Sequence, residues 1–149
     1  MTADSTLAIQ EAARAALIAD ATVISLAGGR VYDAASVPQN LWESNTDFPA
    51  YITVGEADGT QWDTKGSKSN CDGMEGAFTI ETWTSKNGLV ITKQLMAAIV
   101  SVVEALSSGS LTGHVLVWIR LEQSSVRPEN PDGLIGHGVQ RFKFLTEAS

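Results

Sequence analysis

Several features that mark other classes of protein are missing from this 149-residue sequence. Its single cysteine, Cys71, excludes an intramolecular disulfide, and neither histidine stands at zinc-ligand spacing from it. No run of lysine or arginine occurs, and the formal net charge of −7 argues against nucleic-acid binding as the main task. The longest mainly apolar stretch, Leu95–Leu106, is shorter than the ~20 residues that span a bilayer. Because Met1–Gln10 has no basic region, we expect no secretory signal and a soluble protein made in the cytosol.

Motifs that carry catalysis or bind cofactors are also missing. There is no Gly-x-Ser-x-Gly elbow of a hydrolase, and "LAGGR" at Leu26–Arg30 lacks the spacing and the Lys-Ser/Thr pair of a phosphate loop. Asp58, Asp63 and Asp72 lie in one segment, but their irregular spacing does not match an Asp-rich calcium loop. The sequence therefore predicts no enzyme, no cofactor and no metal.

A histidine between two glycines stands out in "NPDGLIGHGVQRFKF", which fills Asn130–Phe144. His137 would need an orienting partner to act as a base and further ligands to hold a metal, and the other histidine, His114, lies on a different predicted strand. In the preferred interpretation Gly136 and Gly138 permit a close approach or a bulge, and His137 is merely the residue between them.

What the sequence contains is typical of one globular domain over residues 1–149, with 44% hydrophobic and 18% charged residues. An Ala-rich amphipathic pattern predicts a helix over Thr6–Ala19, and a second helical pattern runs through Leu95–Leu106. We predict an α+β fold, with two helices packed on one face of a mainly antiparallel sheet. Alternating or apolar runs predict strands at Phe48–Gly55, Gly76–Ser85, His114–Gln123 and Gly138–Leu145.

Between the first two of these strands lies a polar segment, Glu56–Glu75, which predicts a long exposed loop or a solvated hairpin. Its composition cannot bury enough apolar surface to order itself, so we expect it to be mobile in a free monomer. Trp62 is the expected anchor if the segment becomes ordered against a partner, and in the alternative Trp62 packs on its own domain.

The strand faces that point away from the core supply the candidate site. In His114–Gln123 we expect Val115, Val117, Ile119 and Leu121 on one face, and Leu116, Trp118, Arg120 and Glu122 on the other. Trp and Arg are enriched in the cores of protein interfaces, although an antiparallel sheet can also simply face water. The candidate residues for contact with another subunit or partner are Trp62, Asp63, Trp83, Trp118, Arg120, Glu122, Arg141 and Lys143.

Several turn-strand units follow one another along the chain. They are "GGRVYD" at Gly28–Asp33, "VPQN" at Val37–Asn40, "FPAYITVGE" at Phe48–Glu56, "FTIETWTSKNG" at Phe78–Gly88 and "NPDGLIGHGVQRFKF" at Asn130–Phe144. Their order and spacing resemble the tail-completion, or tail-terminator, proteins of long-tailed bacteriophages and related tailed particles such as gene transfer agents. The likeness extends over most of the chain. Two departures are "LWESNTD" at Leu41–Asp47, which resembles an insertion, and the bulky "LIG" before His137.

This resemblance implies a structural virion protein, made in the bacterial host cytoplasm, that forms a homo-oligomeric ring, generally a hexamer. The ring would lie on the head-proximal end of the tail tube, stop tube growth and join the head, with DNA passing through unbound. Its partners would be the tail tube protein and a connector or neck protein, without membrane contact. Two alternatives stay open: a neck or head-closure protein, and a small enzyme or ligand-binding domain using His137, Asp132 and the polar segment.

Overall fold

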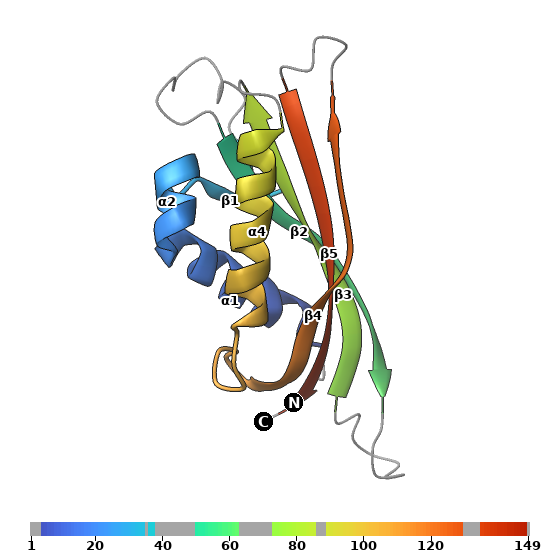
Figure 1. The fold of residues 1–149 in the computed structure, drawn as a ribbon. Helices are drawn as coiled ribbons and strands as arrows, with labels where there is room; N and C mark the ends of the chain where they lie inside the picture. Colours follow the sequence, from blue (N-terminus) through green and yellow to red (C-terminus); the bar gives the residue numbers. More distant parts are fainter. Residues whose placement is uncertain are drawn as a thin grey trace.

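The structure, a computed structural model, describes residues 4–34, 36–37, 50–62, 73–85, 89–129 and 135–148. Within these ranges the chain forms two layers, with three helices on one side of a five-stranded sheet (Figure 1). The predicted α+β class with helices on one face of a mainly antiparallel sheet is confirmed. The number of helices differs from the prediction, because a short third helix follows the first.

The extra helix begins where Asp20 interrupts the first one. α1 (Thr6–Ala19) ends as Asp20 takes an extended conformation, with φ −77° and ψ 132°. The Asp20 carboxylate then accepts hydrogen bonds at 3.1 Å from two backbone N–H groups at the start of α2 (Ala21–Ala27). These bonds satisfy amides that have no partner within the helix, so Asp20 both ends α1 and caps α2. α2 ends at Gly28, which has a left-handed φ of 62°.

The sheet has the strand order β1-β2-β3-β5-β4, so the last strand of the chain lies between β3 and β4. The pair β1–β2 is parallel and the other neighbouring pairs are antiparallel. All four predicted strands are present, and each extends beyond its predicted bounds at one or both ends. The strands are β1 (Val31–Asp33), β2 (Ala50–Trp62), β3 (Gly73–Ser85), β4 (His114–Pro128) and β5 (Ile135–Ala148), and the helix between β3 and β4 is α4 (Val90–Glu104).

Both ends of the polar segment Glu56–Glu75 belong to strands. β2 and β3 pair from Ala57 opposite Phe78 to Trp62 opposite Gly73, which is the hairpin arrangement rather than the loop. A bulge at Glu56, with φ 43°, shifts the register before this pairing begins. The hairpin is therefore the alternative that the structure shows for 57–62 and 73–75, and the mobility expected in a free monomer stays a prediction. Residues 63–72, including Asp63, and the side chain of Trp62 lie outside the described part of the chain.

The predicted division of β4 into two faces is wrong because the strand contains two bulges. The register shifts between Leu116 and Trp118 and again between Leu121 and Gln123. Leu116 is consequently buried against the helices, whereas Val117 is 48% exposed. A bulge inserts one unpaired residue and exchanges the faces of everything that follows it, which a period-2 pattern cannot indicate.

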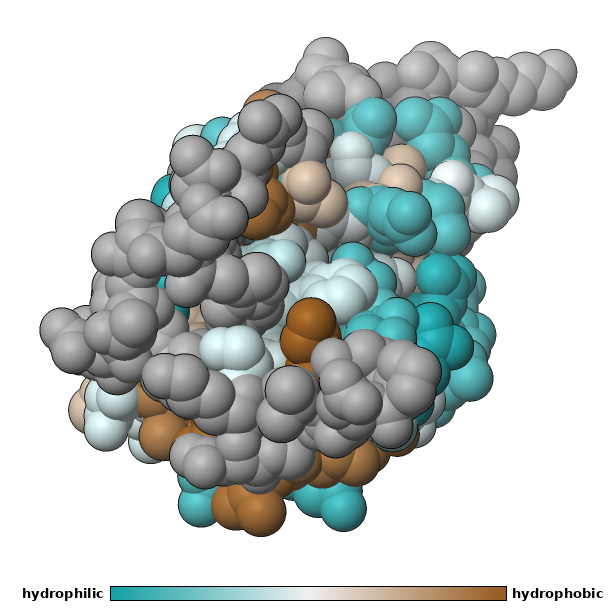
Figure 2. Space-filling view, turned by 90° about the horizontal axis from the view of Figure 1, so that it is seen from above, coloured by the Kyte–Doolittle hydropathy of each residue, from teal (hydrophilic) through white to brown (hydrophobic). Residues whose placement is uncertain are grey.

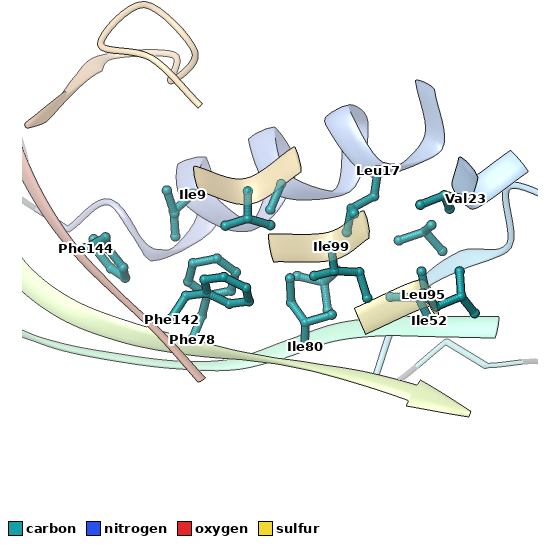
Figure 3. Close-up of a cluster of buried hydrophobic side chains, with 14 of the residues drawn as sticks. Ile9, Leu17, Val23, Ile52, Phe78, Ile80, Leu95, Ile99, Phe142 and Phe144 are labelled. Carbon is teal, nitrogen blue, oxygen red and sulfur yellow. The ribbon is translucent and has the colours of Figure 1, made fainter. Parts of the chain in front are cut away.

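The hydrophobic core fills the space between the two layers. Phe78 of β3 stacks on Phe142 of β5 with ring centroids 5.7 Å apart, and Phe144 lies 6.1 Å from Phe78. In Figure 3 these rings lie beneath the helices, with aliphatic side chains around them. The helices supply Ile9, Leu17, Val23, Leu95 and Ile99, all fully buried.

α4 lies very close to β5 because the strand has glycines beneath it. A Cβ at Gly136 would overlap with the hydroxyl oxygens of Thr92 and Thr84, which are hydrogen-bonded to each other at 2.6 Å. A Cβ at Gly138 would lie 2.5 Å from the Met96 sulfur. Of the two roles that the sequence left open for these glycines, close approach is the one that the structure shows.

We therefore expect Gly136→Ala to lower the free energy of unfolding by about 1–3 kcal/mol, the usual cost of overpacking a filled core. The measurement is urea denaturation at neutral pH. Gly109→Ala is the matched control, because nothing lies within 4 Å of a Cβ built there. Equal stability of the two variants would show that α4 can move away from β5 without cost.

Candidate interaction surface on the sheet

The side of the sheet turned away from the helices is called the outer face here. Alternation along β3 and β5 places Trp83, His137, Arg141 and Lys143 on it, while the residues that point the other way, such as Gln140 and Phe142, are buried under the helices. Seen from the end of the molecule in Figure 2, hydrophilic side chains predominate on the right, the side on which the strands lie in Figure 1.

An aromatic row crosses the outer face over four strands. Tyr32 of β1 meets Tyr51 of β2 edge to face at 6.3 Å, and Tyr51 stacks on Trp83 of β3 at 6.4 Å. Trp83 in turn stacks on the imidazole of His137 in β5, with ring centroids 3.7 Å apart and planes 13° from parallel. Burial, with a smaller contribution from the charge of Glu81, raises the pKa of Tyr51. The four rings thus form one continuous contact.

His137 ends this row and is held by two carboxylates. Its Nδ1 lies 2.5 Å from Glu129 and its Nε2 3.1 Å from Glu81, and only 6% of the residue is exposed. Each nitrogen of the ring therefore faces a carboxylate oxygen. Glu129 also accepts a hydrogen bond from Arg127 at 3.0 Å. The interpretation of His137 as merely the residue between two glycines is therefore wrong.

Further along the outer face, charges of both signs form a connected network. Arg141 donates to Asp58 at 3.3 Å and to Glu122 at 3.1 Å, and Lys143 lies 3.2 Å from Glu122. The hydrogen bond from Lys143, with a further contribution from Arg141, lowers the pKa of Glu122. The hydrogen bond to Asp58 raises the pKa of Arg141. The network links β2, β5 and β4 across the surface.

Two further candidate residues, Trp118 and Arg120, lie beside this network on β4. The Arg120 guanidinium lies over the Trp118 ring, 4.8 Å from its centroid, which is a cation–π arrangement. Arg120 is paired in register with Lys143, so the two cations are neighbours across the β4–β5 ladder. Trp118 is half-buried and Arg120 is exposed, which leaves an aromatic and basic surface available for contact.

The structure thus brings five of the eight candidates together: Trp118, Arg120, Glu122, Arg141 and Lys143. Trp83 shares their face but lies further along the sheet, in the aromatic row. Nothing is described of Asp63 or of the Trp62 side chain.

Sequence reasoning missed Tyr51, Asp58, Glu81, Glu129 and His137. Alternation continued along β2 and β3 places Tyr51 and Glu81 on this face. In the structure Tyr51 is paired in register with Trp83, and Glu81 with Thr53. No local signal marks Glu129, because its contact with His137 depends on the β4–β5 register.

Features of the other side of the molecule are less specific. Shallow hollows between α4 and the first two helices are lined mainly by small residues such as Ala21, Ser25, Ala97 and Ser101. Within the described ranges, His, Cys, Asp and Glu form no group of three or more that could hold a metal ion. No described helix is long and apolar enough to cross a membrane. Asp132, part of the alternative ligand-binding hypothesis, lies outside the described residues.

A broad surface with aromatic and ion-paired side chains is suited to contact with another protein. Comparison with known proteins gives the context: residues 11–147 match the family model described as "Tail completion protein gp17". The chain therefore belongs to the tail completion protein family, and it is a structural protein of the tail in a bacteriophage or related virion.

Among solved structures, the fold is similar to that of a chain in the virion of a native gene transfer agent particle. The TM-score is 0.74 at 21% sequence identity, and the match covers 99% of this chain and 100% of the other. No curated protein matches this chain by sequence.

Because three partners hold its ring, we expect His137→Ala to lower the free energy of unfolding by about 1–3 kcal/mol, the range for hydrogen bonds to charged groups. Chemical denaturation at pH 6 measures it. Arg127→Ala is the control, since Arg127 also binds Glu129 but is 69% exposed and should cost at most about 1 kcal/mol. An unchanged free energy of unfolding in the His137→Ala variant would show that the hydrogen bonds of the imidazole contribute nothing to stability.

The acidic limb of the stability curve gives a second test. The hydrogen bond from His137, followed by that from Arg127, lowers the pKa of Glu129 below its ordinary value of 4.5. A depressed carboxyl pKa contributes stability that is present above pH 4.5 and is lost as the pH falls through the folded-state pKa. Glu129→Gln should therefore be less stable than the wild type at neutral pH and should lose less stability below pH 4.5. Parallel curves for the two proteins would contradict this.

Proposed function

We propose that this chain, acting as a single unit of 149 residues, forms a ring of six copies on the head-proximal end of the tail tube. The ring stops tube growth and provides the surface that joins the head. It is a structural and not a catalytic component, made in the bacterial host cytoplasm. Membership of the tail completion family supports a role in the tail of the virion.

The observation that carries the proposal is the outer face of the sheet. A closed ring needs two different surfaces on opposite sides of each subunit, so that the front of one copy meets the back of the next. The two-layer fold supplies such a pair, with helices on one side and the aromatic, ion-paired outer face on the other. Trp118 and Arg120 combine the two residue types that most often dominate the energy of an interface.

We assign the ring or partner contact to Trp83, Trp118, Arg120, Glu122, Arg141 and Lys143. Their mixed charges favour a specific partner, because a neighbour must present complementary charges to satisfy them. Trp62 and Asp63 remain predicted contributors to the same contact. The tail tube protein and a connector or neck protein are the proposed partners on the two sides of the ring.

DNA passes through the ring without specific binding in this proposal. The net charge of −7 disfavours contact with phosphates, and the basic side chains Arg141 and Lys143 on the outer face are already paired with carboxylates. A bound strand would have to break these ion pairs.

The test is polymerisation of tail tube protein with and without this chain. We expect six-membered rings at one end of the tubes in electron micrographs and a tube length that stops increasing when the chain is added. Trp118→Ala should need at least a tenfold higher concentration to stop growth, without loss of monomer stability. Gly109→Ala is the control, because it lies in the turn between α4 and β4, away from both faces, and nothing lies within 4 Å of the added Cβ.

If the tubes keep growing in the presence of the chain and carry no ring at either end, the proposal is contradicted. Rings that bind the head vertex but not the tube would instead assign the chain to the neck layer.

A further inference from the structure

β2 and β4 form the two edges of the sheet in the half that lies beyond β1, and these two edges differ in how they are protected. β1 covers β2 only at Ile52–Val54. Beyond the bulge, Ala57–Gln61 pairs with β3 on one side, and no described strand flanks it on the other. This part of β2 runs clear of β1 in Figure 1, and its residues from Asp58 to Gln61 are exposed. An edge of this kind presents a row of backbone N–H and C=O groups that can pair with another strand.

The opposite edge, β4, is protected against such pairing. Its bulges at Val117 and Glu122 interrupt the regular spacing of backbone groups. The side chain of Glu104, at the end of α4, accepts the backbone N–H of Leu121 at 3.0 Å and so occupies a donor that an added strand would need. Ala57–Gln61 has no bulge, no proline and no lysine, the usual devices that protect an edge.

The protected part of β4 lies at the same level as the unprotected part of β2. Residue pairing across the sheet aligns Ala57 with Leu121, through Phe78 and Phe142. It also aligns Gln61 with Leu116 through Met74 and Thr146. The ring proposed above joins the helical side of one copy to the outer face of the next, so it leaves the edges of the sheet unpaired. A second copy that paired edge to edge at the same level would present the bulged segment of β4 to the edge of β2, which makes it a poor partner.

The charge along this edge defines the chemistry of the partner. Glu56 and Asp58 on β2 and Glu75 on β3 are exposed, and they are the only charged side chains that these two strands carry within 55–61 and 73–79. One described cation, Arg141, reaches them, through its ion pair with Asp58. The edge therefore attracts a strand that carries lysine or arginine.

We propose that Ala57–Gln61 receives an extended, basic segment of a different tail protein, which adds a strand to the sheet next to β2. Backbone hydrogen bonds hold the added strand, and the acidic side chains select it. The proposal rests on the proposed assembly of this chain into the tail and names one partner in it by its chemistry.

A thiol-to-lysine cross-linker of short reach tests the proposal in purified, assembled tails. The variant is Thr60→Cys combined with Cys71→Ser, which places the single thiol on the β2 edge. Ser125→Cys with Cys71→Ser places it on an exposed position of β4 as the matched control. Mass spectrometry should identify a lysine-containing peptide of another tail protein at position 60, with at least tenfold less of it at position 125.

Hydrogen exchange supplies a second measurement with the unmodified chain. Exchange of the amides of Asp58–Gln61 that point outward should be at least tenfold slower in tails than in the free chain. Cross-links from position 60 to a second copy, equal linking from both positions, or unchanged exchange would overturn the proposal. If rings still cap the tubes in electron micrographs, only the strand addition fails. If the chain enters no tail, the proposed function fails with it.

Discussion

At Gly136 and Gly138 the interior strand β5 presents no side chain to α4, and the helix fills the space so closely that a Cβ would overlap with Thr92 and Met96. This contact fixes how far the helical layer lies from the sheet. The depth of the core follows from it, because Phe78, on the neighbouring strand β3, must pack within that separation. Packing at the density of protein interiors leaves little room for adjustment.

The same strand also organises the opposite surface. β5 pairs with β3 over residues 135–147 without a register shift, so every second residue faces away from the helices. His137 therefore projects onto the outer face from between the two glycines under α4, and Arg141 follows four residues later. A change in the register of β5 would bury the charges and expose the core together. Stability and surface chemistry are for this reason coupled in β5, whereas β4 tolerates two bulges at the edge.

Patterns of period 2 and 3.6 were enough to predict the fold class, α1 and the position of four strands, because these features are local. The predicted first helix ends at Ala19, as α1 does, but α2 was not predicted, although the aspartate at position 20 is a preferred capping residue. The faces of β4 were wrong because no residue type marks its bulges. His137 was underestimated because its partner Glu81 lies 56 residues away. The clustering of Trp118, Arg120, Arg141 and Lys143 could be predicted, but not the contribution of Asp58.

The place of β5 in the sheet has a consequence for synthesis of the chain. β5 follows β3 and β4 in the chain but is inserted between them, and its Thr146 hydrogen-bonds Ser5 at 2.6 Å, just before the first helix. Until β5 has left the ribosome, β3 and β4 each lack their common neighbour and expose backbone edges. The sheet can therefore close only after β5 has been made, and its pairings are largely long-range, which slows folding. Chains that are made close together must keep these nascent edges apart until then.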